Sequence, residues 1–330
     1  MNYFLVESPL QYLNAREAKY KLCVDEKNVL IILRGASPKS MNQIKKLVDH
    51  SCWDSVYELP NSHNKMMLYK WQNELESILK EKRSKVNNVF IGEYRSLLMR
   101  NFVHKSNCKK SFLLDDGNVA LFIHKKIISK EGLRSTLNPI RKALNWLFNF
   151  NDKDIWDINF FTFYSEYTRE TDIINDYSFL KCSLKKKKVE EGQVYFLGNN
   201  ISEYGFIERK DYLTLLRRVL DYFEGKTVYY VPHRRENSKK FQEIENLGFE
   251  FKNIDEPIET YLIKQNKLPE IIASFISTAL DNCYALFGNS SMLYSFQYDL
   301  DIINSFKYKK TSKIIYKRYR KYDNFTIIKL

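Results

Sequence analysis

The feature that most constrains the fold is an alternation of short apolar runs with amphipathic segments along the whole chain. Most of the apolar runs lack in-and-out alternation, which is typical of parallel strands covered on both faces. Between them, hydrophobic residues recur at spacings of three and four, as in Leu68, Trp71, Leu75 and Ile78, which predicts helices. This order favours doubly wound α/β domains.

The apolar runs predict nine strands. We expect them at Tyr3–Glu7, Val29–Leu33, Val89–Gly92, Ser111–Asp115, Asn159–Phe163, Val194–Leu197, Val228–Val231, Thr260–Ile263 and Tyr284–Phe287. The chain has 330 residues, whereas single cores stop growing at about 250–300 residues, so two domains are expected. The stretch from Tyr164 to Glu191 is polar and is the expected boundary. We therefore predict two Rossmann-type domains, 1–180 and 181–330, facing a central cleft with ligands at the carboxyl ends of strands.

Cysteine usage and hydropathy indicate the compartment. The five cysteines show no CxxC or Cys/His spacing, which indicates reduced thiols in a cytosolic protein and argues against structural zinc. The opening residues lack a positive n-region, and Glu7 and Pro9 interrupt their apolar run, so a signal peptide is not expected. No stretch approaches 18 consecutive apolar residues, so no transmembrane helix is expected either.

Positive charge is unevenly distributed. Lys and Arg number 53 against 40 Asp and Glu, giving a net charge of +13. Basic residues concentrate in Lys181–Lys188 and in Lys307–Lys321, where they alternate with Tyr and Ile. Three interpretations stay open: a solvated basic face, an anchor on anionic lipid at the inner face of the cytoplasmic membrane, or nucleic-acid binding. The chain has no Walker-type or RRM-type pattern to accompany the last of these.

Two carboxylates follow a predicted strand in the first half. The run Phe112–Leu114 leads into Asp115, Asp116 and Gly117, and the glycine permits a sharp turn. Adjacent side chains of a strand point to opposite sides, so one carboxylate is expected at the ligand site and the other in the scaffold. A carboxylate at the site can remove a proton from a hydroxyl. An ordinary Asp-Asp-Gly turn is the alternative.

Two segments of the second half have the same layout. The strand Val228–Val231 is followed by Pro232, His233, Arg234, Arg235 and Glu236, a candidate anion site with a group that titrates near neutral pH. The strand Val194–Leu197 is followed by Gly198, Asn199 and Asn200. The alternative for His233 is a purely structural histidine.

A third segment of the second half pairs two serines. Gly288, Asn289, Ser290 and Ser291 follow the expected strand Tyr284–Phe287, and either serine is expected to begin a helix whose N–H groups suit a phosphate. Ordinary N-capping is the alternative.

Taken in order, these motifs resemble those of bacterial GT-B sialyltransferases. The nearest group is the lipooligosaccharide sialyltransferases of glycosyltransferase family 52, to which the bacterial polysialyltransferases are related. The resemblance is carried by Asp115-Asp116-Gly117, by Pro232–Glu236, by Ser290-Ser291, and by the segments Glu7–Gln11 and Phe196–Gly198. The chain departs from the family pattern at Arg234, where proline is usual after the histidine.

The resemblance implies an inverting, metal-independent transfer from a CMP-linked sialic or related nonulosonic acid to a bacterial surface glycan such as lipooligosaccharide, O-antigen or capsule. Asp115 would be the base on the acceptor hydroxyl and His233 would assist the departing CMP phosphate. Donor contacts would come from Asp116, Gly117, Gly198, Asn199, Asn200, Arg234, Arg235, Glu236, Glu259, Ser290 and Ser291, and acceptor-side contacts from Ser8 and Gln11. The 1–180 domain would hold the acceptor and the 181–330 domain the nucleotide.

The donor and the protein class have alternatives. A transferase of Kdo, pseudaminic acid, legionaminic acid or a nucleotide-diphosphate hexose would share the fold. A basic nucleic-acid-binding protein is the alternative of another class. No cofactor is expected beyond the donor substrate, and the family likeness is compatible with a homodimer.

Overall fold

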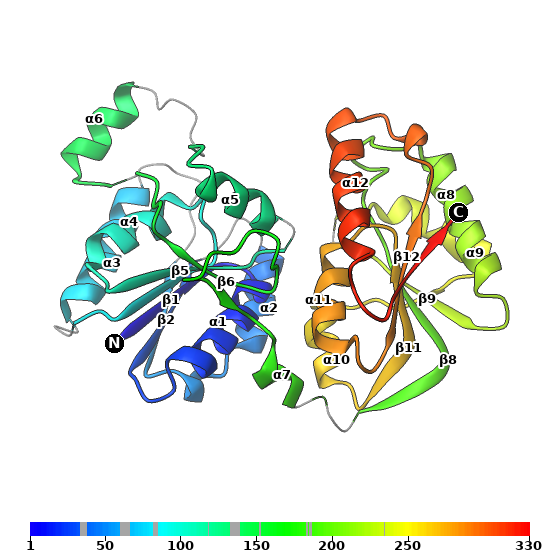
Figure 1. The fold of residues 1–330 in the computed structure, drawn as a ribbon, viewed down its shortest axis with the longest axis horizontal. Coiled ribbons are helices and arrows are strands. Elements are labelled where there is room, and N and C mark those ends of the chain that lie inside the picture. Colours follow the sequence, from blue (N-terminus) through cyan, green and yellow to red (C-terminus); the bar gives the residue numbers. More distant parts are fainter. Residues whose placement is uncertain are drawn as a thin grey trace. The chain divides into compact units, whose positions relative to one another are not determined.

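The computed structural model forms two compact units, Met1–Phe179 and Leu180–Leu330 (Figure 1). It describes residues 1–33, 38–59, 67–81, 85–117, 119–132, 139–151, 153–182, 184, 187–233 and 235–330. Arg234, Lys185 and Lys186, which the sequence analysis singled out, lie outside these residues.

The N-terminal unit is built on one parallel sheet. Its described strands are β1 (Asn2–Val6), β2 (Asn28–Leu33), β3 (Ser55–Leu59), β4 (Asn88–Ile91), β5 (Lys110–Leu114), β6 (Asn159–Thr162) and β7 (Ile173–Ile174). They lie in the order β3-β2-β1-β4-β5-β6-β7, and every pair is parallel. Because β1 and β4 are neighbours, the direction in which successive strands are added reverses between them.

Helices cover both faces of this sheet (Figure 1). Side chains of α1 (Pro9–Leu22) and α2 (Pro38–Leu47) pack with Phe4 and Val6 on one face. Side chains of α3 (Met67–Glu81), α4 (Leu97–Ser106) and α5 (Val119–Ile128) pack with Tyr3 and Leu5 on the other. The helices α6 (Pro139–Leu147) and α7 (Ser178–Cys182) complete the described helices that begin in this unit. Covering on both faces explains why all residues of β1 and β2 are buried.

The C-terminal unit repeats the plan. Its described strands are β8 (Lys188–Leu197), β9 (Thr227–Val231), β10 (Glu250–Phe251), β11 (Lys267–Ser274), β12 (Met292–Gln297) and β13 (Phe325–Lys329). They lie in the order β10-β9-β8-β11-β12-β13, again all parallel. Its helices are α8 (Arg209–Tyr222), α9 (Phe241–Leu247), α10 (Ile258–Lys264), α11 (Thr278–Phe287) and α12 (Phe306–Tyr319). Figure 1 shows α8 and α9 on one face of the sheet and α10 and α11 on the other.

The predicted fold class is confirmed, but two predicted strands are wrong. Thr260–Ile263 lies inside α10 and Tyr284–Phe287 lies inside α11. Both are short apolar runs, and such runs do not distinguish a strand from a buried helix. The strands in this region are β11 and β12 instead. Pro269 interrupts the apolar run of β11, and the register of β11 against β8 shifts between Pro269 and Ile271, as expected at a bulge.

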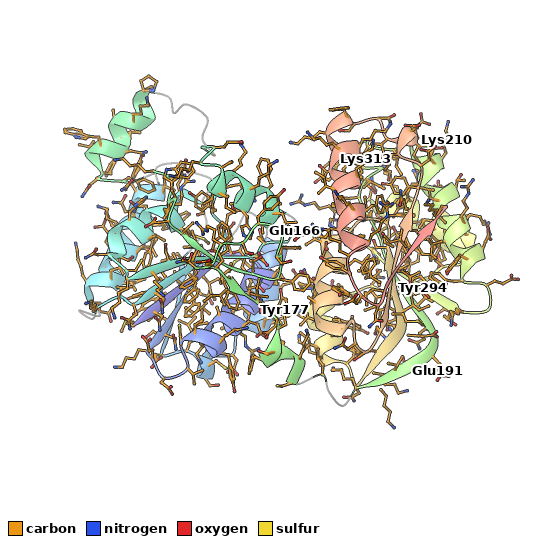
Figure 2. The ribbon with its side chains drawn as sticks, viewed as in Figure 1. Glu166, Tyr177, Glu191, Lys210, Tyr294 and Lys313 are labelled. Carbon is orange, nitrogen blue, oxygen red and sulfur yellow. The ribbon has the colours of Figure 1, made fainter. Side chains whose placement is uncertain are left out.

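The basic segment Lys307–Lys321 forms α12 and the turn after it, and its aromatic side is part of the core. Tyr316 and Tyr319 are buried, and Arg318 is buried against Asp281 of α11, with N–O distances of 2.9 Å to both carboxylate oxygens. The exposed charge therefore comes from residues such as Lys313, which is exposed and is labelled on α12 in Figure 2.

Part of the other basic run is also structural. The Lys187 ammonium donates to the carbonyl oxygens of Leu262 at 3.0 Å and Ile263 at 2.6 Å, in the last turn of α10. A cation at this position stabilises unpaired carbonyls and the negative end of the helix dipole. No helix in the described part of the chain is long and apolar enough to span a bilayer.

The buried Asp281–Arg318 pair generates a stability prediction. Asp281→Ala leaves the guanidinium buried without its carboxylate, so we expect a loss of about 3–5 kcal/mol in the free energy of unfolding. Asp301→Ala is the matched control, because Asp301 pairs with Lys309 at the surface and should contribute less than about 1 kcal/mol. Urea unfolding of both variants checks the difference, and equal losses would contradict it.

Candidate active site

In a parallel sheet all strands end at the same edge, and the side chains that follow them converge there. We call this the carboxyl edge of each sheet. In the N-terminal unit it receives Glu7 and Ser8 after β1, Glu93 after β4, and Asp115 and Asp116 after β5. These strands are adjacent in the sheet, and the reversal in strand order lies between β1 and β4. The predicted acidic pair is thus at the expected edge.

Asp116 is the half-buried member of the pair. Its Oδ1 accepts a hydrogen bond of 3.2 Å from the Ser8 hydroxyl, which also caps the N-terminus of α1. Burial is the main cause of a raised pKa for Asp116, and the charge of Glu93 adds to it. The structure therefore joins two residues predicted from separate motifs.

Asp115 is buried, and its carboxylate is held by the scaffold. Oδ2 accepts from the backbone N–H of Phe163 at 2.7 Å, and the backbone carbonyl of Asp115 accepts from the Asn14 amide at 2.9 Å. Burial raises the pKa of Asp115 to about 7, although hydrogen bonds from Thr162 and Phe163 oppose the shift. Gly117 then turns the chain into α5 with φ of 70°, in the region that favours glycine.

His124 is a residue that the sequence analysis missed. It lies on α5, is fully buried, and stacks on Phe160 with ring centroids 3.9 Å apart. Its Nε2 lies 3.9 Å from Asp115 Oδ1. Burial lowers the pKa of His124 to about 3, so the imidazole is neutral at neutral pH. His124 follows the buried Ala120 by four residues on α5, so the helical pattern predicts that it lies in the core. The same pattern does not predict that it is a neighbour of the acid pair.

Glu7 adds a further perturbed carboxyl at the same edge. Burial raises its pKa to about 7, assisted by repulsion from Glu93 and Asp116 and opposed by Arg95. Arg95 forms an ion pair with Glu93. The backbone N–H of Glu7 donates to Gln11 Oε1 at 2.8 Å, so the predicted acceptor-side residue Gln11 shapes this loop. Carboxyl groups with pKa values near 7 are suited to accept protons at physiological pH.

His233 follows β9 at the carboxyl edge of the C-terminal sheet. It is half-buried, and its Nδ1 accepts a hydrogen bond of 3.2 Å from the backbone N–H of Arg235. An imidazole that accepts at Nδ1 carries its proton at Nε2 when neutral. The Arg235 side chain donates to the Tyr204 hydroxyl at 2.9 Å.

A buried network fixes the turn that carries His233. Glu236 accepts from the backbone N–H of His233 and, at 2.6 Å, from the Tyr230 hydroxyl. The Lys240 ammonium is buried between Glu236 at 2.7 Å and Glu203 at 3.0 Å. A Cβ at Gly198 would overlap Glu236 and Tyr230, so only glycine fits this close approach. Glu236 thus supports His233, and its predicted donor contact stays a prediction.

Asn199 connects the ends of β8 and β11. Its amide donates to the Ile276 carbonyl at 2.8 Å, and its backbone N–H donates to the Tyr212 hydroxyl at 3.1 Å. Ser274, the last residue of β11, donates to the Leu197 carbonyl at 2.8 Å. The reversal in strand order of this sheet lies between β8 and β11, where ligands bind in open α/β sheets.

The serine pair predicted for this edge is misplaced. Ser290 and Ser291 precede β12, so they lie at the opposite edge of the sheet, and Ser291 is buried with its hydroxyl bonded to Pro269 O at 2.8 Å. The expectation that they begin a helix was wrong because Tyr284–Phe287 is helical. Ser277 caps a helix at the carboxyl edge, at the N-terminus of α11.

The signal for Ser277 was present in the sequence. An apolar run, Ile271 to Ala273, precedes Ser277-Thr278, and a helical pattern follows them. Glu259, predicted as a donor contact, is buried on α10 and accepts from the Asn282 amide of α11 at 2.7 Å. Its predicted role stays a prediction.

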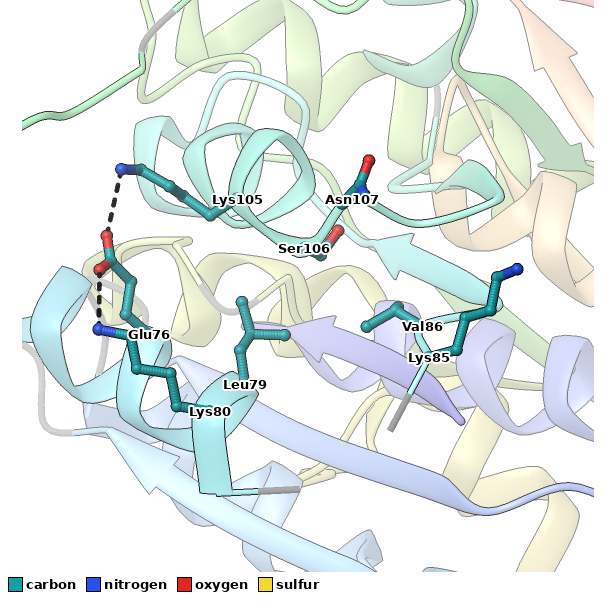
Figure 3. A pocket seen from close by; sticks show the side chains of 8 residues that line it. All are labelled: Glu76, Leu79, Lys80, Lys85, Val86, Lys105, Ser106 and Asn107. Carbon is teal, nitrogen blue, oxygen red and sulfur yellow. Dashed lines mark ion pairs between the residues drawn. The ribbon is translucent and has the colours of Figure 1, made fainter. Parts of the chain in front are cut away.

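A surface pocket of about 470 Å³ lies elsewhere, at the opposite edge of the N-terminal sheet (Figure 3). It is lined by residues from the last turns of α3 and α4 and from the segment just before β4, among them Lys80, Lys105 and Glu76. None of the predicted site residues lines it. Within the described residues, no group of three His, Cys, Asp or Glu side chains is placed to hold a metal ion.

Comparison of the structure with solved structures identifies the fold. An α/β-galactoside α-2,3-sialyltransferase from Photobacterium phosphoreum matches with a TM-score of 0.55 at 11% identity, over 99% of this chain and 97% of that chain. A UDP-glucosyltransferase from Polygonum tinctorium (TM-score 0.53, 10% identity, 99% and 84% covered) and UGT2 from Phytolacca americana (TM-score 0.50, 12% identity, 99% and 84% covered) are also similar. The fold is therefore GT-B.

The sequence comparison identifies the family. No curated protein sequence matches the chain. The family model described as alpha-2,8-polysialyltransferase (POLYST) matches residues 2–295, which span the acidic pair, His233 and Ser277. This match confirms the predicted resemblance. The chain belongs to the alpha-2,8-polysialyltransferase family and is a sialyltransferase-type glycosyltransferase with the GT-B fold.

Proposed function

We propose that the protein transfers a sialic acid or a related nonulosonic acid from a CMP-linked donor to a hydroxyl of a bacterial surface glycan, with inversion at the anomeric carbon. The observation that carries the proposal is the family match over residues 2–295. A carboxylate pair after β5 and an imidazole after β9 support it, because this transfer needs a base for the acceptor hydroxyl and an acid for the departing phosphate.

In this proposal Asp116 accepts the proton of the acceptor hydroxyl. The sequence-based hypothesis gave this role to Asp115, which is 3% exposed, and that assignment stays a prediction. Asp116 is half-buried, and hydrogen bonds from Ser8 and Gln11 hold its carboxylate at the carboxyl edge of the sheet. Asp115 then positions the loop through the backbone N–H of Phe163.

His233 stabilises or protonates the departing CMP phosphate. The hydrogen bond that Nδ1 accepts leaves the proton on Nε2, the nitrogen that can donate to phosphate oxygen. The N-terminus of α11, capped by Ser277, favours the same anion through its backbone N–H groups and dipole. The phosphate gains one negative charge on departure, which these donors can stabilise.

The proposal also covers the identity of the donor sugar and the place where the acceptor is held. A screen of CMP-, UDP- and GDP-sugars that follows nucleotide release distinguishes sialic acid from Kdo, pseudaminic acid, legionaminic acid and hexose donors. For attraction to an anionic membrane, Lys307–Lys321 offers exposed lysines, but its tyrosines are packed inward. A homodimer stays a prediction from the family likeness.

The division of roles between the two carboxylates is testable. Asp116→Asn should lower kcat by roughly 10²–10⁴-fold, because it removes the base, while CMP binding is retained. Asp115→Asn should stay within about tenfold of wild type, since an amide oxygen can still accept from Phe163 N–H. Transfer from CMP-sialic acid to a labelled soluble acceptor measures both. A larger loss of kcat in Asp115→Asn than in Asp116→Asn would indicate that Asp115 is the base.

His233 should act in the chemical step and not in folding. His233→Ala is expected to reduce turnover by roughly 10²–10⁴-fold with an unchanged melting temperature, because the side chain is half-buried at a strand end. Lys210→Ala is the control, since it removes only an exposed ion pair with Glu208. Loss of activity in His233→Ala together with a lowered melting temperature would indicate a structural role.

The raised pKa of Asp115 predicts a pH-dependent stability. Between its unfolded pKa near 4 and its folded pKa of about 7, the folded protein keeps a proton that the unfolded chain has lost. Wild-type stability should therefore fall relative to Asp115→Asn as the pH rises from 4 to 7, by up to about 1.4 kcal/mol per pH unit. Urea unfolding of both proteins across this range measures the difference, and a constant difference would show that Asp115 ionises normally.

A further inference from the structure

A buried histidine and a buried aspartate lie close together near the carboxyl edge of the N-terminal sheet. The exposed fractions are 0% for His124 and 3% for Asp115. Among the described residues, no hydrogen-bond partner contacts either ring nitrogen of His124 or Oδ1 of Asp115. His124 Nε2 and Asp115 Oδ1 lie 3.9 Å apart. Buried polar atoms almost always have a hydrogen-bond partner, because an unpaired one costs free energy, so these two atoms are candidates to pair with each other.

The surrounding contacts hold both groups where they can meet. The His124 ring stacks on Phe160 with an interplanar angle of 9°, which fixes the plane of the imidazole. Asp115 is anchored through Oδ2 by the backbone N–H of Phe163 and through its own backbone carbonyl by the Asn14 amide. A hydrogen bond needs a separation of about 2.7–3.2 Å, so a closure of about 1 Å joins Nε2 to Oδ1.

The chemistry of the two groups allows this bond in both charge states of Asp115. Burial raises the pKa of Asp115 to about 7 and lowers the pKa of His124 to about 3, so the imidazole stays neutral while the carboxyl group titrates. A neutral imidazole carries one proton, on either Nδ1 or Nε2. The carboxylate can therefore accept from Nε2–H, and the carboxylic acid can donate to Nε2 while the ring proton lies on Nδ1.

The other charged groups near the pair do not prevent this arrangement. Asp172 favours and Arg169 disfavours a charged imidazole, and these two residues form an ion pair with each other at 2.9 Å. The charges of Asp116 and Glu166 disfavour the ionised form of the buried carboxyl group. Because the influences on the imidazole oppose each other, it remains a neutral donor or acceptor, which the pairing requires.

We propose that His124 is a positioning residue, which shares one proton with Asp115 along the line from Nε2 to Oδ1 and so fixes the turn that presents Asp116. Asp115 directly precedes Asp116, and this bond ties it to α5 as well as to α1 and to the segment after β6. A displacement of about 1 Å can cost about 10²-fold in rate. The effect on turnover rests on the proposed function, whereas the shared proton does not.

Histidine-selective nitrogen NMR of the full-length protein tests the shared proton. The chain has five histidines, and His124→Phe identifies the signal of His124 by its loss. We expect the ring proton to move from Nδ1 to Nε2 as the pH rises through about 7, without formation of imidazolium. Asp115→Asn should hold the ring proton on Nδ1 at every pH, because its amide oxygen accepts from Phe163 and its amide N–H donates to Nε2.

Transfer from CMP-sialic acid to a soluble acceptor tests the positioning. His124→Phe should lower kcat by roughly 10–10²-fold with little change in KM for the donor, because phenylalanine keeps the stack on Phe160 but has no nitrogen. His124→Gln should restore kcat to within about threefold of wild type, since an amide can donate to a carboxylate or accept from a carboxylic acid. His104→Phe is the matched control and should leave kcat unchanged, because His104 lies on α4 and contacts the Lys153 carbonyl.

Three results would overturn the proposal. They are a His124 signal that keeps one tautomer from about pH 5 to 9, an unchanged kcat in His124→Phe, and equal losses of kcat in His124→Phe and His124→Gln. Melting temperatures measured in parallel verify that the variants fold. The NMR readout needs no substrate, so a protein that shows the proton shift but transfers no sialic acid contradicts the proposed function alone.

Discussion

Every functional assignment in this protein depends on the parallel hydrogen-bonding of two sheets. Parallel pairing sends all strand ends to one edge, so residues far apart in sequence become neighbours there. Asp116 meets Ser8 across 108 positions in the sequence for this reason, and Asn199 meets Ile276 across 77. The strand order reverses between β1 and β4 and between β8 and β11, and open α/β sheets bind ligands at such reversals.

Buried carboxylates have different partners at the carboxyl edges of the two sheets. In the N-terminal unit, Glu7, Asp115 and Asp116 gather with limited compensation, and their pKa values rise, which suits a site that must accept a proton. In the C-terminal unit, Glu236 and Glu203 are paired with the buried ammonium of Lys240. This pairing fixes Glu236, which accepts from the backbone N–H of His233 and so holds the turn that carries His233. Burial still raises the pKa of Glu236, whereas the pKa of Glu203 is lowered, despite burial, by its hydrogen bonds from Asn237 and Lys240.

Much of the fold could be predicted from the sequence, since both sheets are built from continuous apolar runs such as Leu5 and Val6 or Val194–Leu197. The acid pair and His233 were identified because each follows such a run directly. The prediction failed where local pattern and tertiary structure disagree. Tyr284–Phe287 has the composition of a strand but completes the buried face of α11. Because Pro269 interrupts its apolar run, β11 was not predicted, and the helix start was expected at Ser290 or Ser291 instead of Ser277. The Asp115–His124 proximity has no local signature, because α5 and β5 meet only through tertiary packing.

The outermost strands of the two sheets carry a further consequence. β7 and β10 are two residues long, and the longer outer strands β3 and β13 contain Glu58 and Lys329. Unpaired backbone groups along an edge strand can form hydrogen bonds with strands of other molecules. Short edge strands and charged side chains on them disfavour this pairing. Parallel sheets also assemble slowly, because their strands are distant in sequence. The short or charged edge strands should therefore help the newly made chain avoid aggregation before its helices have packed on the sheets.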